Sequence, residues 1–362
     1  MGDGVGAADP ATDGKGAGTA GRAPMLRRIS IAGFKSIRKI ENLELRPINV
    51  LIGPNGSGKS NFIQTFALMQ AIEAARLDEY VLKAGGADRL LHFGRRTTDK
   101  ITLQLEFGEA PTRYELLASD DDRLRAVWTY PMAPEFADLR DALKRRLSFL
   151  RVYHFHDTGN HSPMKLTAKV DDNRLLHPDG RNLAAFLYLL KERYPDSYDL
   201  IRRTIQLVAP FFEDFQLVPR ALNPDTIRLE WRHKSSDMHF DVSSLSDGTL
   251  RFIALATLFL QPEELRPSVI IVDEADLGLH PAAIDVLASL VRRVSHRTQV
   301  IMATQSVALL DRFEPEDVIV ADRTGNEVSF RRLDGSDLAE WLESYTLSEL
   351  WEKNVLGGGP TR

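Results

Sequence analysis

Residues 53–60 read Gly-Pro-Asn-Gly-Ser-Gly-Lys-Ser, an octapeptide from which the architecture of the chain follows. It matches the pattern G-x-x-x-x-G-K-[ST] at every fixed position. The mostly apolar run 47–52 precedes it, which predicts a buried parallel strand that ends at glycine. A helix is predicted from Lys59 to about Arg76. A strand, a glycine-rich loop and a helix in this order predict a phosphate-binding loop.

The residue types of this loop suit a nucleoside triphosphate. Glycines let backbone N–H groups curve around a phosphate, and the N-terminus of the following helix adds partial positive charge. The ammonium group of Lys59 would reach the β- and γ-phosphates, and the hydroxyl of Ser60 would ligate Mg²⁺. The predicted nucleotide-binding residues of this segment are Gly53, Asn55, Gly56, Ser57, Gly58, Lys59, Ser60 and Asn61. The expected cofactors are ATP and Mg²⁺.

A second acidic site follows an apolar strand later in the chain. Four apolar residues, Val269–Val272, precede two acids, Asp273 and Glu274. A buried strand that ends in a carboxylate places that group at the C-terminal edge of the sheet, where the phosphate-binding loop is also expected. Asp273 is predicted to hold Mg²⁺, directly or through water, and Glu274 is predicted to polarise the attacking water. Together with the loop at 53–60, this pattern predicts ATP hydrolysis.

The segment Leu245-Ser246-Asp247-Gly248-Thr249 lies ahead of this strand and opens a helix that is apolar nearly all round, which predicts a buried helix. Two interpretations remain open. In the first, Ser246 or Asp247 only caps the helix. In the second, the segment is an ABC-type signature loop, in which Ser246, Gly248 and the helix N-terminus bind the γ-phosphate held by another subunit. The position between the two nucleotide motifs favours the second interpretation, with Asp247 pointing back into a capping role.

The composition excludes several classes of protein. The 362 residues carry a net charge of −5, so any nucleic-acid site must be a local basic patch. Cysteine is absent, which removes disulfides, cysteine-ligated metals and thiol nucleophiles and fits a reducing cytosol. The longest apolar run, residues 252–260, is much shorter than the ~20 residues of a membrane span. We therefore expect a cytoplasmic protein without a membrane partner.

Changes in composition and periodicity divide the chain into four parts. Residues 1–24 are rich in glycine and alanine and are expected to form a disordered tail. Residues 25–135 carry the phosphate-binding loop and strands that alternate like an antiparallel meander. Helical spacing dominates residues 136–235, an expected helical or mixed insert lobe, and strand–helix alternation returns in residues 236–358. The predicted fold class is α/β, a phosphate-loop NTPase with a mixed or parallel sheet.

Several motifs together resemble the RecF-like predicted ATPases of bacteria, which are relatives of the SMC, RecF and OLD ATPases. They are the phosphate-binding loop, the segment 245–249, Phe34-Lys35-Ser36, Asp273-Glu274-Ala275-Asp276-Leu277-Gly278-Leu279-His280-Pro281 and Ala303-Thr304-Gln305-Ser306. Three further stretches, 152–158, 171–174 and 350–358, resemble the same family. The resemblance runs from about residue 25 to residue 358. It implies an ABC-type ATPase head that forms a homodimer around two ATP molecules.

The resemblance also assigns roles to residues outside the two nucleotide motifs. Lys35 would contact the nucleotide, and Gln305 would stand where ABC ATPases usually have a switch histidine. Glutamine can hydrogen-bond a γ-phosphate or a water molecule, but it cannot carry a proton. His280 takes the place of the D-loop aspartate of transporters. SMC coiled-coil arms are absent, and the stretch after Ser306 is too short for the Toprim nuclease domain of OLD proteins, so a nuclease is expected only as a separate partner.

Two local patterns each have a structural and a functional interpretation. A histidine-rich segment contains His154, His156, Asp157 and His161. A metal site is one interpretation, and a structural or nucleotide-adjacent polar strand is the favoured one. The basic residues of the helix expected around 139–150 are Arg140, Lys144, Arg145, Arg146 and Arg151. They form either a solvated face or a patch for the phosphate backbone of DNA, and arginine pairs at 202–203, 292–293 and 331–332 add positive charge.

The sequence predicts a Mg²⁺-dependent, ATP-hydrolysing RecF/SMC-like ATPase that acts on DNA in repair, recombination or genome defence. One alternative is the ATP-driving subunit of an ABC transporter, and another is an ATPase that regulates a partner protein without acting on DNA. A transporter subunit would show Leu-Ser-Gly-Gly-Gln and a D-loop aspartate, which this chain lacks. A small-molecule kinase would need neither Glu274 nor a separate signature loop.

Overall fold

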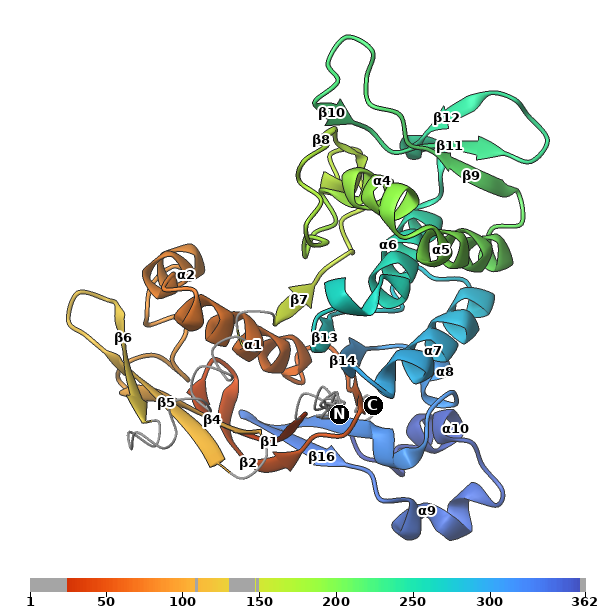
Figure 1. Ribbon diagram of the computed structural model, residues 1–362. Coiled ribbons are helices and arrows are strands. Elements are labelled where there is room, and N and C mark those ends of the chain that lie inside the picture. Colours follow the sequence, from red (N-terminus) through yellow and green to blue (C-terminus); the bar gives the residue numbers. More distant parts are fainter. Residues whose placement is uncertain (1–24, 108–109, 130–146, 148–149, 359–362) are drawn as a thin grey trace, which may run out of the picture.

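The computed structural model of the protein describes residues 25–107, 110–129, 147 and 150–358 (Figure 1). The expected tail at 1–24 lies outside the described residues. So does most of the helix expected around 139–150, including the basic residues Arg140, Lys144, Arg145 and Arg146. In the described part of the chain, no helix has the length and apolar character that crossing a membrane requires.

The first sheet is antiparallel and has five strands in the order β2-β1-β4-β5-β6. Its strands are β1 (Leu26–Phe34), β2 (Ile37–Glu44), β4 (Lys100–Phe107), β5 (Ala110–Ala118) and β6 (Leu124–Thr129). The expected antiparallel meander is confirmed by β4, β5 and β6. The hairpin β1–β2 joins the same sheet because β1 pairs with β4.

The second sheet has six strands in the order β16-β15-β3-β14-β13-β7. They are β3 (Ile48–Ile52), β7 (Arg151–Tyr153), β13 (Val269–Val272), β14 (Gln299–Thr304), β15 (Val318–Thr324) and β16 (Glu327–Arg332). All neighbours pair in parallel except β15 and β16. The short strand β7 falls inside the range 136–235, yet it pairs with β13 at the edge of this sheet.

Alternation along the buried strands separates two hydrophobic cores. On β3, the side chain of Val50 packs into a core that also contains the buried residues of α6 and α7, whereas Leu51 packs into a core shared with α1 and the five-stranded sheet. Every residue of β3 and β13 is buried. A strand covered on both faces needs apolar residues at successive positions, which explains why these strands read as continuous apolar runs.

The helices cover the six-stranded sheet and build the lobe beside it. They are α1 (Lys59–Glu73), α2 (Leu77–Ala84), α4 (Leu183–Arg193), α5 (Pro195–Val208), α6 (Asp247–Leu260), α7 (Pro281–Ser295), α8 (Val307–Leu310), α9 (Gly335–Leu342) and α10 (Leu347–Glu352). Helix α1 ends at Glu73 rather than at Arg76, because Ala75 adopts a left-handed φ of 54°. All α6 residues from Leu250 to Leu260 are buried, which confirms the predicted buried helix.

Helices α4 and α5 lie with several short strands in a lobe at the top of the view in Figure 1. These strands are β8 (Ala168–Lys169), β9 (Phe212–Gln216), β10 (Thr226–Ile227), β11 (Glu230–His233) and β12 (His239–Asp241). They form two small antiparallel sheets, β10-β8 and β12-β11-β9. The lobe leads directly into α6, so its packing positions the start of that helix.

Candidate functional site

The two predicted nucleotide motifs meet at one edge of the six-stranded sheet. Strands β3, β14 and β13 are parallel neighbours, so their C-terminal ends lie side by side. A cavity opens there, and its walls contain Asn55, Gly56, Ser57, Gly58, Lys59, Ser60, Asn61, Asp273, Glu274, Ala303, Thr304 and Gln305. The structure thus brings together the phosphate-binding loop, both acids after β13 and the expected switch residue Gln305.

The loop before α1 has the geometry of an anion site. Gly58 stands at the start of α1 with φ 92°, a conformation that favours glycine, and α1 has no side-chain cap. The N–H groups of its first turn can therefore bind an anion. The buried Lys59 donates from Nζ to the Gly53 carbonyl at 2.5 Å and to the Pro54 carbonyl at 3.0 Å. Desolvation by burial lowers the pKa of Lys59, although nearby carboxylates oppose this effect.

The cavity contains oxygen atoms that suit a hard cation. Among the described residues, the buried Oδ1 of Asp273 and the buried Oγ of Ser57 have no hydrogen-bond partner. A buried carboxylate oxygen without a donor is costly unless a cation or another polar group satisfies it. The exposed Ser60 lines the same cavity. Carboxylate and hydroxyl oxygens are ligands that Mg²⁺ accepts, so Asp273 and Ser60 fit the expected metal.

The backbone at Glu274 is strained. Glu274 has φ 52°, which is unusual for a residue with a side chain, and such strain concentrates at functional sites. Two hydrogen bonds hold this turn: the Leu277 N–H donates to the Glu274 carbonyl at 3.2 Å, and the Ala275 N–H donates to the Ala303 carbonyl at 3.3 Å. These hydrogen bonds therefore fix the backbone of Glu274, from which its side chain extends.

Asp276 is an acid near the cavity to which the sequence analysis assigned no role. Burial raises the pKa of its carboxyl group, and a hydrogen bond from Thr304 opposes that rise. Its Oδ1 has no hydrogen-bond partner among the described residues. The sequence signal was present in Asp273-Glu274-Ala275-Asp276, where a third acid closely follows the first two.

The segment 245–249, called the signature loop from here on, begins α6. Ser246 caps the helix by accepting a hydrogen bond from the Thr249 N–H at 3.2 Å. The expected capping role of Asp247 is wrong, because Ser246 is the N-cap and Asp247 is already the first residue of α6. The Asp247 carboxylate lies 3.6 Å from the ammonium group of Lys165. The side chain of Lys165 is only 6% exposed, and its positive charge partly neutralises the negative charge of Asp247. The cavity walls of the same chain include neither Ser246 nor Gly248.

The ammonium group of Lys35 is engaged elsewhere. It donates to the side chain of Gln64 on α1, and Lys35 is not part of the cavity walls. Desolvation by burial lowers the pKa of Lys35. The turn that carries Lys35 still touches the phosphate-binding segment, because Asn61 Nδ2 donates to Ser36 Oγ at 2.7 Å. The structure therefore gives Lys35 a contact with α1 rather than a place in the cavity.

The histidine-rich segment does not form the expected strand. Strand β7 ends at Tyr153, so His154 and His156 follow it, with ring centroids 5.8 Å apart. The Asp273 N–H donates to the Tyr153 carbonyl at 3.2 Å, so His154 lies near the end of β13. Burial lowers the pKa of His154, while the charges of Asp273 and Glu274 oppose that shift. Within the described residues, no group of three or more histidine, aspartate and glutamate side chains is arranged to hold a metal ion.

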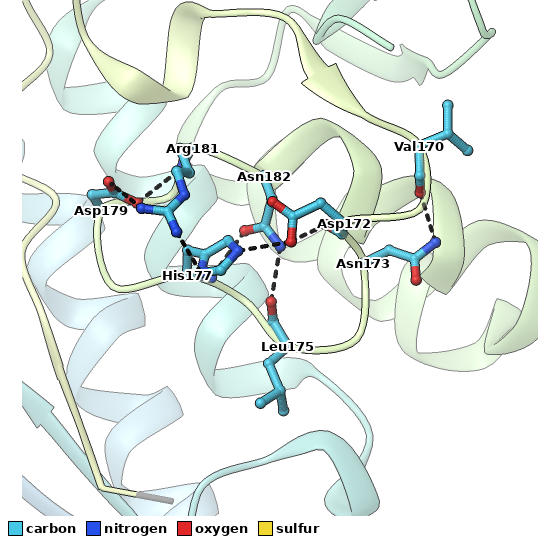
Figure 2. A network of polar contacts seen from close by, with 8 residues as sticks. All are labelled: Val170, Asp172, Asn173, Leu175, His177, Asp179, Arg181 and Asn182. Carbon is cyan, nitrogen blue, oxygen red and sulfur yellow. Dashed lines mark hydrogen bonds and ion pairs between the residues drawn. The ribbon is translucent and has the colours of Figure 1, made fainter. Parts of the chain in front are cut away.

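Figure 2 shows a network of polar contacts among residues 170–182, in the loop between β8 and α4. The fully buried Asn182 accepts from the His177 N–H at 2.9 Å and donates to the carbonyls of Asp172 and Leu175, each at 2.8 Å. The His177 ring also contacts Asp172 Oδ1 at 2.8 Å. From this loop the Pro178 carbonyl accepts from the His154 N–H at 2.9 Å. The segment 171–174 thus helps to fold a loop that holds the end of β7.

Several arginines of the expected basic pairs are used within the fold. Arg202 and Arg203 both pair with Asp199. Arg331 donates to the Leu356 carbonyl at 2.7 Å, and Arg332 donates to the Glu44 carbonyl at 2.7 Å. Asp199 therefore offsets part of the positive charge at 202–203. The carbonyl contacts of Arg331 and Arg332 hold these side chains within the fold but leave their charge unchanged.

Comparisons with known proteins agree with this geometry. No curated protein matches the chain. The SMC head bound to the C-terminal winged-helix domain of ScpA has a TM-score of 0.62 at 15% identity, and the match covers 87% of this chain and 99% of that one. The SMC head of Pyrococcus furiosus, with an extended coiled coil and bound to the C-terminal domain of ScpA, has a TM-score of 0.60 at 15% identity over 88% and 99%. The SMC head of Pyrococcus yayanosii has a TM-score of 0.57 at 12% identity, again over 88% and 99%.

These matches confirm the predicted α/β phosphate-loop NTPase fold and its likeness to an SMC-type ATPase head. A family model matches residues 48–311, a range that contains the phosphate-binding loop, the signature loop, the acids after β13 and Gln305. The chain therefore belongs to the family described as AAA domain, putative AbiEii toxin, Type IV TA system.

Proposed function

We propose that the protein is a Mg²⁺-dependent ATPase, and that two copies enclose ATP between the phosphate-binding loop of one and the signature loop of the other. The observation that supports this most strongly is the cavity that joins Lys59, Ser60, Asp273 and Glu274 from the ends of adjacent strands. Residues far apart in the chain meet there with the side chains that phosphoryl transfer to water requires.

Each residue of the cavity has a role that follows from its chemistry. Lys59 binds the β- and γ-phosphates, together with the N–H groups at the start of α1. Ser60 and Asp273 would hold Mg²⁺, which neutralises phosphate charge when it is bound. Glu274 accepts a hydrogen bond from the attacking water and takes its proton as general base. Gln305 hydrogen-bonds this water or the γ-phosphate.

The position of the signature loop supports a homodimer. The loop does not line the cavity of its own chain, and its Asp247 side chain is 66% exposed. The N-terminus of α6, with the Ser246 cap, is therefore open to a ligand that another copy brings. ATP bound between two copies favours the dimer by mass action, because it binds the dimer better than the monomer.

Ser246→Arg tests this arrangement in the wild-type background. The larger, charged side chain would block the approach of a second copy, while the cavity of the same chain is untouched. We expect ATP binding to remain and the rate of phosphate release per subunit to fall by at least about tenfold. A conservative Ser246→Thr variant keeps the capping hydroxyl and is expected to retain most activity. If Ser246→Arg hydrolyses ATP at the wild-type rate, the signature loop is only a capped helix start.

DNA is the partner that the sequence resemblance favours. We expect single- or double-stranded DNA to raise ATP hydrolysis severalfold, with an effect that weakens as salt rises because phosphate contacts release counterions. The measurement is phosphate release with and without each DNA form at two salt concentrations. Unchanged rates would contradict a DNA role.

Unchanged rates with DNA would favour the alternative of an ATPase that regulates a partner protein. Two observations support this alternative. The matched family is described as a putative toxin of a toxin–antitoxin system. Two of the similar SMC heads were solved with a domain of ScpA bound, so heads of this fold can carry a protein partner.

A further inference from the structure

Arg251 is a buried charged residue in the otherwise apolar portion of α6, and its side chain is only 5% exposed. Its guanidinium group donates to three backbone carbonyls: Nε to Phe155 at 2.9 Å, Nη2 to His156 at 2.8 Å and Nη1 to Leu277. Two acceptors follow β7 and the third follows β13. We propose that Arg251 is a positioning residue that couples the signature loop to Glu274 of the same chain, an inference that rests on the proposed dimeric ATPase.

The first link joins the signature loop to the segment after the catalytic acids. Gly248 lies directly against the carbonyl of Gly278, and a Cβ atom on Gly248 would clash with that oxygen. Gly278 has φ 70°, and a Cβ atom there would lie 2.8 Å from Arg251 Nη1. Gly248, Gly278 and the Arg251 guanidinium group are in close contact with no space between them. A displacement of the start of α6 must therefore move the segment around Gly278.

The second link runs through one peptide segment to the catalytic acid. The Leu277 carbonyl accepts from Arg251, and the Leu277 N–H donates to the carbonyl of Glu274 at 3.2 Å. Glu274 has the strained φ of 52°, a conformation that persists only where neighbouring groups hold it. Arg251 therefore fixes the position of Leu277, and Leu277 in turn stabilises the backbone turn at Glu274.

The third link is electrostatic. Desolvation by burial lowers the pKa of Arg251, and the charges of Asp247, Glu274 and Asp276 oppose this shift. Because its acceptors are all neutral carbonyls, the guanidinium charge remains attractive both to the acid of the signature loop and to the acids beside the cavity. The three contacts use three different nitrogens of one planar group, whereas the three donors of a lysine ammonium group share a single nitrogen, so lysine cannot reproduce these positions.

These links make hydrolysis at one site depend on the other site. When the signature loop of a chain binds the ATP held by its partner, the start of α6 is fixed, and Arg251 transmits this constraint to Leu277 and Glu274. The Glu274 carboxylates of the two copies then reach their catalytic positions together. Loss of Arg251 is expected to leave ATP binding and dimer formation in place while misplacing Glu274.

The test compares Arg251→Met and Arg251→Lys with the control Arg266→Met. Arg266 is also a partly buried arginine that donates to a backbone carbonyl, that of Gln261 just after α6, but it is remote from the signature loop. We expect kcat to fall about ten- to a hundredfold for both Arg251 variants, the usual effect of displacing a catalytic group by about 1 Å. KM for ATP should stay within about twofold, and Arg266→Met should keep the wild-type kcat.

Two further measurements separate coupling from loss of stability. In the Glu274→Gln background, Arg251→Met should still form a dimer with Mg·ATP. In a double-mutant cycle, Ser246→Gly and Arg251→Met together should lower kcat by less than the product of their separate effects, because both substitutions interrupt the same coupling. If Arg251→Met fails to fold, Gly278→Ala, which displaces the guanidinium group, replaces it and should show the same loss of kcat.

The coupling role is overturned if Arg251→Met keeps the wild-type kcat, if it loses ATP binding and dimer formation as well, or if the effects of the two substitutions simply add. Each of these results leaves the proposed ATPase standing, provided that the wild-type protein hydrolyses ATP and dimerises. Failure of the wild-type protein in both assays would instead contradict the proposed function itself.

Discussion

Glu274→Gln is expected to retain ATP binding and to lower kcat by about 10²–10⁴, the usual contribution of a general base. Glutamine has the shape of glutamate and can occupy the same turn, but its amide cannot accept a proton from water. The turn at Glu274 is held by backbone contacts through Ala275 and Leu277, which the substitution leaves in place. Binding and chemistry should therefore separate cleanly in this variant.

Single-turnover phosphate release and equilibrium binding of ATP, each at saturating Mg²⁺, measure these two effects. Glu264→Gln is a suitable control, because Glu264 is an exposed acid in the short helix after α6 and should not alter kcat. A fully active Glu274→Gln protein would remove the assigned role of Glu274. The general base would then have to be another group beside the cavity, and His154 is a candidate because it follows Tyr153, whose carbonyl accepts from the Asp273 N–H at 3.2 Å.

Lys59→Ala is expected to abolish detectable ATP binding. The substitution removes the point charge that faces the β- and γ-phosphates. It also removes the hydrogen bonds from Nζ to the carbonyls of Gly53 and Pro54, which hold the loop in its cradle shape. Both losses act on the same phosphate contacts, so the effect should exceed that of any other single substitution in the loop.

Thermal unfolding with and without Mg·ATP measures this loss, because a ligand that binds only the folded state raises Tm. ATP should raise the Tm of the wild-type protein and leave that of Lys59→Ala unchanged. Lys83→Ala provides the matched control: Lys83 is an exposed lysine on α2 that pairs with Glu79, and its loss should preserve the shift. Undiminished ATP affinity in Lys59→Ala would rule out the assignment of the site.

The core of the fold could be predicted because its signals are local. The apolar runs that become β3 and β13 are each followed directly by their functional residues, and parallel pairing brings those ends together. The loop between β3 and α1 matches the phosphate-binding pattern at every fixed position and stands in the strand–loop–helix context that this pattern requires. For this reason the residues from Asn55 to Asn61 lie around one cavity with Asp273, Glu274 and Gln305, while their roles stay predictions.

The remainder depended on contacts between distant segments. Strand β7 has three residues, too few for a periodic signal, and its place in the sheet is set by pairing with β13. Arg251 was overlooked because the helix reads as apolar, although a lone arginine among apolar residues is itself a signal. Its acceptors follow β7 and β13, which no local pattern reveals. Lys35 was placed by motif alone, but Gln64 takes its ammonium group.

The mass of the Glu274→Gln protein with and without Mg·ATP tests the central claim most directly. This variant retains ATP, so a dimer held together by nucleotide should accumulate rather than turn over. Light scattering should show a monomer of 40.6 kDa without nucleotide and twice that mass at saturating Mg·ATP. A protein that binds ATP but remains a monomer would contradict this claim. The signature loop of one copy would then not contact the γ-phosphate bound by another.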